Sequence, residues 1–275
     1  MKPMATLAER FFERGWVAFE PDPGIAEWAG AVRPLAEAAL EDPALRARWL
    51  RSGGTWFVGV HALGNDASGA VAERGVPPIS GRAVAFVHEA LELGHFAWDN
   101  AQISVCMPGY PQSDPQESEA AYRFRVKRDA AHVDGLLRDD GGRRYLGETH
   151  AFILGVPLAR VAPCEAPFVV YEGSHEVMRR AFARRLDGIE PARWPDEDLT
   201  EAYTAARREA FDACRRVEIH VRPGEAYMVH RLALHGIAPW REPDGGSAPE
   251  ARRMIAYFRP DAFPGEAPGW WLERR

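Results

Sequence analysis

The chain has 275 residues, of which 46% are hydrophobic and 27% are charged, so it can bury a sizeable core and its composition requires neither disorder nor a fibrous repeat. Its formal net charge of −6 gives no general attraction for phosphate backbones or anionic lipids, which excludes nucleic acid as an expected partner. Segment 1–14 alternates apolar and charged residues and no later stretch approaches a membrane span, so we expect a soluble cytoplasmic protein without a membrane partner.

The first third of the sequence is predicted to be mainly helical. Apolar residues recur at helical spacing from Leu7 to Phe12, an Ala/Leu/Glu-rich run follows over 25–40, and another periodic run covers 83–93. We interpret 1–95 as the helical flank of a single domain that spans 1–275.

Short runs rich in β-branched and aromatic residues follow this flank. They cover 101–107, 151–158, 167–171, 217–221, 225–229 and 254–258, and Pro-Gly pairs punctuate them. This pattern is typical of an antiparallel sandwich or barrel, so we predict an α+β protein with a jelly-roll core over 96–275. The Ala-, Arg- and Glu-rich segment 174–216 is predicted to be a helical insertion between two strands that covers one mouth of the barrel.

Two short motifs contain residues of the types that bind iron. In His132-Val133-Asp134, residues i and i+2 of an extended chain face the same side, so the histidine and the aspartate can both point into a barrel. A remote histidine in His235-Gly236 supplies a third donor. Two imidazoles and one carboxylate are the facial triad of non-haem Fe(II) oxygenases, which leaves the other metal positions open. A nearby arginine, Arg252 or Arg253, could hold a distal carboxylate in a bidentate pair.

With these motifs the chain resembles the phytanoyl-CoA dioxygenase family of Fe(II)- and 2-oxoglutarate-dependent oxygenases. The resemblance is carried by the segments 12–17, 107–109, 131–134, 167–175 and 224–236 and by Arg252/Arg253. It implies a cupin-like double-stranded β-helix core, with His132, Asp134 and His235 as the iron ligands and catalytic residues and Arg253 as the 2-oxoglutarate clamp.

The chain also departs from the family pattern. Glu172 stands where the family usually has the proline of Pro-Gly-Ser/Thr-His, and Ile237 stands where a serine usually follows the His-Gly pair. The stretch from 235 to 252 is longer than usual. These differences leave the three iron ligands intact and concern the secondary contacts of the cosubstrate.

Two assignments require a choice between neighbouring residues. His230 and His235 lie near the end of one predicted strand and would face opposite sides, so only one is expected to bind metal, and the resemblance favours the His-Gly histidine. Adjacent strand residues also point to opposite faces, and we choose Arg253 as the inward arginine, with Arg252 facing solvent.

The resemblance implies an enzyme that uses Fe(II), O2 and 2-oxoglutarate, with ascorbate as a supporting reductant. It would hydroxylate a small molecule and release succinate and CO2. Two alternatives remain: a cupin-type metalloenzyme that does not use 2-oxoglutarate, and a non-catalytic binding domain stabilised by metal. The sequence leaves the primary substrate and the oligomeric state open.

Overall fold

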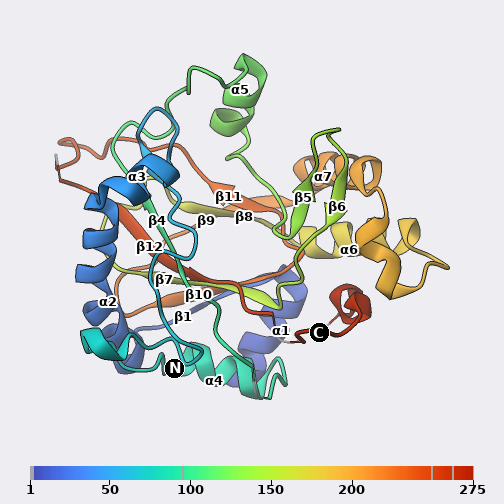
Figure 1. Ribbon diagram of the computed structural model, residues 1–275, viewed down its shortest axis with the longest axis horizontal. Coiled ribbons are helices and arrows are strands. Elements are labelled where there is room, and N and C mark those ends of the chain that lie inside the picture. Colours follow the sequence, from blue (N-terminus) through green and yellow to red (C-terminus); the bar gives the residue numbers. More distant parts are fainter. Residues whose placement is uncertain (1–2, 95, 249, 262, 275) are drawn as a thin grey trace.

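The computed structural model describes residues 3–94, 96–248, 250–261 and 263–274 (Figure 1). The predicted boundary at residue 95 and both ends of the predicted domain, 1 and 275, lie outside the described residues. None of the helices in the described part of the chain combines the length and the apolar character that a membrane crossing requires.

The N-terminal third contains four α-helices and also contributes strands to the main sheet. Its elements are α1 (Met4–Arg14), β1 (Trp16–Phe19), α2 (Pro23–Glu41), α3 (Pro43–Trp49), β2 (Leu50–Arg51), β3 (Trp56–Phe57), η1 (Ala72–Arg74) and α4 (Arg82–Glu89). The helices follow the predicted periodic runs. The strands β1, β2 and β3 were not predicted, because runs of two to four residues are too short to show a period.

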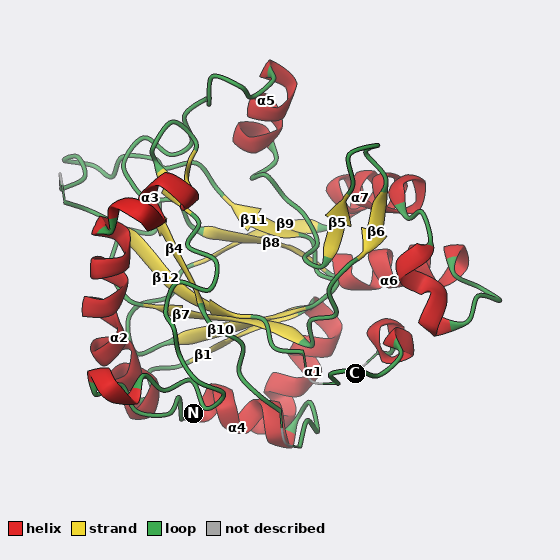
Figure 2. Ribbon diagram, viewed as in Figure 1, coloured by secondary structure: helices red, strands yellow, loops and turns green. Residues whose placement is uncertain are grey.

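Two antiparallel sheets face one another in the centre of the molecule (Figure 2). The larger sheet has the order β1-β10-β7-β12-β4-β3-β2 and the smaller one the order β11-β8-β9. The strands not yet given bounds are β4 (Gln102–Cys106), β7 (Phe152–Pro157), β8 (Phe168–Glu172), β9 (Arg215–Ile219), β10 (Ala226–His230), β11 (His235–Ile237) and β12 (Arg253–Phe258). The hairpin of β5 (Leu136–Arg138) and β6 (Arg144–Leu146) lies outside both. The predicted α+β class is confirmed, with a large antiparallel sheet consistent with a jelly-roll core.

The large sheet is buried on both faces. On β12, Ile255 and Tyr257 point between the two sheets, whereas Met254, Ala256 and Phe258 pack with apolar residues of α1, α2 and α4. Strands covered on both sides read as continuous apolar runs rather than alternating ones. This explains why the sequence of β12 predicts a strand without showing which of its residues face the interior.

Helices fill the connection between β8 and β9. They are α6 (Ser174–Arg185), η2 (Pro191–Asp196) and α7 (Thr200–Ala213), and they form a separate apolar core together with the C-terminal η3 (Pro268–Leu272). A further helix, α5 (Glu119–Lys127), precedes the candidate metal ligands in the chain. That the helices between β8 and β9 cover a barrel mouth stays a prediction.

One glycine of the large sheet makes room for a tyrosine ring that packs between the two sheets. A Cβ at Gly155 of β7 would meet the ring of Tyr227 across the strand pair. We therefore expect Gly155→Ala to reduce the free energy of unfolding by about 1–3 kcal/mol, the usual cost of overpacking. Urea denaturation would measure this, with Gly30→Ala as the control, because a Cβ at that exposed position of α2 meets nothing within 4 Å. Equal effects of the two substitutions would contradict this account.

Candidate metal centre

The three predicted ligands come together in the structure. One donor atom from each of His132, Asp134 and His235 lies within 4.8 Å of the others, and we call these residues the candidate triad. Oδ1 of Asp134 lies 3.1 Å from Nε2 of His132 and 3.7 Å from Nε2 of His235. In the described part of the chain, this is the group of histidine, cysteine and acidic side chains close enough to hold one metal ion.

The backbone joins the two histidines directly. The amide of His132 donates to the carbonyl of His235 at 2.8 Å, and the amide of His235 donates back at 3.0 Å. His132 makes only this isolated bridge, so the predicted strand at His-x-Asp is replaced by an extended loop. The alternation of sides still holds, because Val133 between the ligands points away and packs in the core under α6 and α7. Gly135, with φ of +82°, then turns the chain into β5.

Hydrogen bonds fix the orientation of both imidazoles. Nδ1 of His132 lies 3.0 Å from the carbonyl oxygen of Ala130, and Nδ1 of His235 lies 2.9 Å from that of Ala233. A carbonyl oxygen only accepts, so each Nδ1 must carry a proton, and Nε2 has the free lone pair when the ring is neutral. Backbone partners of this kind orient metal-binding histidines in proteins. Both Nε2 atoms are thus prepared to bind a metal ion.

The charge state of the triad also suits a divalent metal. Burial lowers the pKa of His235 to about 4, so this imidazole is neutral near pH 7. Burial opposes the charge of Asp134, but His235, Arg259 and His132 together hold its pKa well below the usual value. Nη1 of Arg259 lies 3.4 Å from Oδ2 of Asp134. Burial opposes the charge of His132, but its bond to Asp134 raises the pKa of this imidazole, so its Nε2 must lose a proton before it binds a metal. With both imidazoles neutral, two ring nitrogens and one carboxylate are donors that Fe(II) accepts.

An ionic network around the buried carboxylate of Asp129 holds the loop that carries His132. The carboxylate of Asp129 accepts two bonds from Arg216 on β9, at 2.7 and 2.8 Å, and one from the hydroxyl of Tyr171 on β8 at 3.1 Å. Its carbonyl accepts from the amide of Ile237 on β11 at 3.0 Å. Asp129 therefore ties all three strands of the small sheet to the ligand loop. Sequence reasoning missed this residue, because its partner Arg216 is 87 positions away.

The close approach of two backbones explains the glycine of the His-Gly pair. A Cβ at Gly236 would meet the carbonyl oxygen of Asp129. Only glycine lets β11 lie this near to the loop, and this proximity allows the histidine before it to reach Asp134.

The two neighbouring arginines have different environments. Arg253 is only 4% exposed, and its Nη2 donates to the hydroxyl of Tyr257 at 2.9 Å. Its Nη1 is buried without a hydrogen-bond partner, and no carboxylate among the described residues pairs with it. Arg252 is half-buried, with its Nη1 donating to the carbonyl of Ala251. Burial opposes the charge of Arg253, but Tyr257, Tyr227 and Cys106 around it raise its pKa, so it stays a cation.

His230 lies away from the candidate triad. It ends β10, and the turn closed by the Ala233 amide bonding to the carbonyl of His230 separates it from β11. The prediction that His230 and His235 share one strand is therefore wrong, since the turn moves the chain from one sheet to the other. The buried ring of His230 lies 4.9 Å from that of His175, and its Nδ1 accepts from the amide of Leu232.

A cavity of about 170 Å³ adjoins the candidate triad. Its walls include the apolar side chains Trp56, Ile153, Phe168 and Ile237, together with the polar Ser104, Gln102, Tyr257 and Arg259. The side chain of His132 is 48% exposed, so solvent reaches this ligand, whereas Asp134 and His235 are mostly buried. We call this space the metal cavity.

The chain matches known proteins by structure and not by sequence. No family model matches the chain, and no curated protein matches it by sequence. Among solved structures, AviO1 from Streptomyces viridochromogenes Tue57 is 16% identical with a TM-score of 0.53, over 98% of this chain and 99% of that one. SnoK, a non-heme alpha-ketoglutarate-dependent carbocyclase from nogalamycin biosynthesis, is 14% identical with a TM-score of 0.50, over 93% and 82%.

A third structure is that of the epimerase SnoN in complex with Fe3+, alpha-ketoglutarate and nogalamycin RO. It is 15% identical, with a TM-score of 0.50, over 93% of this chain and 82% of that one. This chain has the fold of these three proteins. At such low identities the likeness concerns the fold, and membership of the phytanoyl-CoA dioxygenase family stays a prediction.

The glycine next to His235 provides a test of the metal centre. Gly236→Ala should move β11 away from the loop and weaken binding of a divalent metal at least tenfold, because His235 then no longer reaches Asp134. Isothermal titration with Mn(II) in an anaerobic buffer would measure the affinity. Gly30→Ala on α2 is the control and should bind as the unmodified protein does. A Gly236→Ala protein with unchanged affinity would contradict the geometry described above.

Proposed function

We propose that the chain is an Fe(II)- and 2-oxoglutarate-dependent dioxygenase of the phytanoyl-CoA dioxygenase-like type, which hydroxylates a small molecule. The observation that carries the proposal is a candidate triad whose imidazole nitrogens face one carboxylate, combined with a buried arginine that has no carboxylate partner among the described residues. Iron bound at the triad would supply the position at which O2 is activated while 2-oxoglutarate is converted to succinate and CO2.

The triad residues fit iron in number and orientation. His132, Asp134 and His235 would hold the iron, and with three protein ligands its remaining positions would be open to cosubstrate and oxygen. Oδ1 of Asp134 faces both imidazoles, whereas Oδ2 points to Arg259. The carboxylate is therefore arranged to bind through one oxygen, and Arg259 acts on it as a positioning residue.

Arg253 and its neighbours fit the distal carboxylate of 2-oxoglutarate. The guanidinium would form a bidentate pair with that carboxylate, in which the orphaned Nη1 takes part. The hydroxyl of Tyr257 accepts bonds from Arg253 and from the hydroxyl of Tyr227 at 2.8 Å, so its own proton is left to donate to the same carboxylate. This hydroxyl would replace the donor that is lost where Ile237 stands in place of the family serine.

The alternatives do not account for Arg253. Burying a guanidinium among tyrosines costs free energy unless an anion pairs with it. A metalloenzyme without 2-oxoglutarate, or a metal-stabilised binding domain, gives no reason for a cation that is only 4% exposed and bonded to Tyr257, a residue of the metal cavity. A dicarboxylate cosubstrate supplies the missing partner.

The metal cavity suits a small primary substrate. Its volume of about 170 Å³ and its largely apolar walls would hold a compact group next to the metal. The fold neighbours include a carbocyclase and an epimerase, so the same architecture serves more than one oxidative outcome. A halogenase would need a small residue in place of Asp134 to admit chloride, so this carboxylate favours hydroxylation over halogenation. We expect ascorbate to support turnover by keeping the iron reduced.

Turnover of the cosubstrate tests the proposed chemistry. Purified protein with Fe(II), ascorbate and 2-oxoglutarate under air should form succinate slowly even without a primary substrate. His132→Ala or Asp134→Ala should abolish this, because each removes a metal ligand, whereas His88→Ala on α4 should leave it unchanged. Succinate is measured by chromatography. Equal succinate formation by either ligand variant and the unmodified protein would disprove the catalytic role of the triad.

Binding of the cosubstrate tests the arginine assignment. We expect Arg253→Ala to weaken 2-oxoglutarate binding to the Fe(II) protein by roughly 30-fold or more, corresponding to about 2 kcal/mol for a lost buried charge pair. Arg252→Ala should have little effect. An anaerobic titration that follows the visible charge-transfer band measures the affinity, and a separate metal titration should show no change in either variant. A large loss in Arg252→Ala alone would reverse the assignment.

A further inference from the structure

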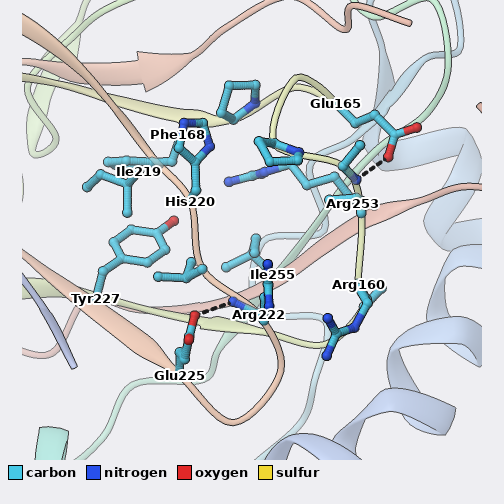
Figure 3. Close-up of a pocket in the computed structure, with 16 residues that line it drawn as sticks. Arg160, Glu165, Phe168, Ile219, His220, Arg222, Glu225, Tyr227, Arg253 and Ile255 are labelled. Atoms are coloured by element: carbon cyan, nitrogen blue, oxygen red, sulfur yellow. Dashed lines mark hydrogen bonds between the residues drawn. The ribbon is translucent and has the colours of Figure 1, made fainter. Parts of the chain in front are cut away.

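A second cavity lies at one end of the space between the sheets (Figure 3). It has a volume of about 340 Å³, and the connections 158–167 between β7 and β8 and 220–225 between β9 and β10 provide much of its wall. Three arginines line it: Arg160, Arg222 and Arg253. We call it the arginine pocket.

Arg253 is reached from the arginine pocket and not from the metal cavity. Its side chain extends from β12 into this pocket, and it does not line the metal cavity (Figure 3). Of the described residues, Phe168 alone lines both spaces. Its ring stacks on His235 with centroids 5.4 Å apart and an angle of 14°, and it also lies 4.9 Å from the ring of Tyr227. Phe168 therefore stands as a partition between the metal centre and the arginine.

The mouth of the arginine pocket favours anions. Arg160 and Arg222 are exposed there, and their guanidinium groups form no ion pair with any described residue. The two carboxylates in the lining are engaged by the loops: Glu165 accepts from the amide of Ala162 at 2.6 Å, and Glu225 from the amide of Arg222 at 2.8 Å. These bonds hold the two carboxylates in place but leave their charge, so three arginines face two carboxylates and the lining keeps an excess of one positive charge that attracts an entering dianion.

We propose that the arginine pocket is the passage by which the 2-oxo dicarboxylate enters and the dicarboxylate product leaves. Arg160 and Arg222 attract the anion at the mouth, Arg253 receives its distal carboxylate, and the ring of Phe168 turns aside to let the keto-acid end reach the metal. The primary substrate uses the metal cavity instead, so a bound substrate does not block the exchange of succinate for a new cosubstrate. This inference rests on the proposed function.

The charge at the mouth is tested by association kinetics. The Fe(II) protein is mixed with 2-oxoglutarate in an anaerobic stopped-flow instrument, and the charge-transfer band reports binding without turnover. Arg160→Ala/Arg222→Ala should lower the association rate constant about tenfold at low salt and weaken its dependence on ionic strength, with a smaller change in dissociation. Arg184→Ala/Arg208→Ala removes the same charge from α6 and α7 and should leave the rate unchanged.

The route itself is tested by closing each opening in turn. Ala162→Trp narrows the arginine pocket and should slow both 2-oxoglutarate association and succinate dissociation at least fivefold, whereas Val60→Trp narrows the metal cavity and should change neither. Thermal unfolding verifies that each variant is folded. Equal rates in both tryptophan variants, or slowing by Val60→Trp alone, would overturn the passage while leaving the proposed function intact. Absence of any 2-oxoglutarate signal from the unmodified protein would overturn the proposed function and the passage together.

Discussion

The mutual backbone hydrogen bonds between His132 and His235 are the constraint on which the candidate site depends. They bring together two segments about a hundred residues apart and set the imidazoles side by side, with ring centroids 4.8 Å apart. No side chain intervenes in this link, so its geometry does not depend on rotamers. Two residues make this bridge possible. Gly236 allows the two backbones to approach closely, and Asp129 anchors the loop of His132 to β8, β9 and β11.

Two buried charges of opposite sign, those of Asp134 and Arg253, lie in different parts of the interior. An ionised Asp134 lies among two imidazoles and Arg259, and the cation of Arg253 lies among tyrosine hydroxyls on the far side of Phe168. Burying either charge alone costs free energy. The carboxylate of Asp134 has an arginine partner within the protein, whereas the guanidinium of Arg253 has no carboxylate partner among the described residues. This asymmetry distinguishes a site prepared for a divalent metal from a site prepared for a carboxylate.

The sequence predicted the site more completely than it predicted the surroundings of the site. The pair His132 and Asp134 followed from residue types and from the i, i+2 rule, which requires only that the chain be extended and therefore still held where a loop replaced the predicted strand. The third ligand, His235, followed from the family resemblance. The N-terminal strands β1, β2 and β3 were not predicted because they are short and acquire their partners only in the folded sheet. The turn between His230 and His235 was missed for a related reason, since the run 226–235 is apolar throughout much of its length and shows no break.

What the sequence determined by itself is the local chemistry: two imidazoles and a carboxylate with the spacing of a metal site, a glycine after the second histidine, and two arginines on the following strand. Only the tertiary structure decided that Arg253 rather than Arg252 faces the interior, that Asp129 pairs with Arg216, and that Phe168 separates the metal cavity from the arginine pocket. Local periodicity fixes which residues share a face, because backbone geometry repeats along the chain. It does not fix what that face meets, because the facing residues come from distant strands that are brought together only when the two sheets pack.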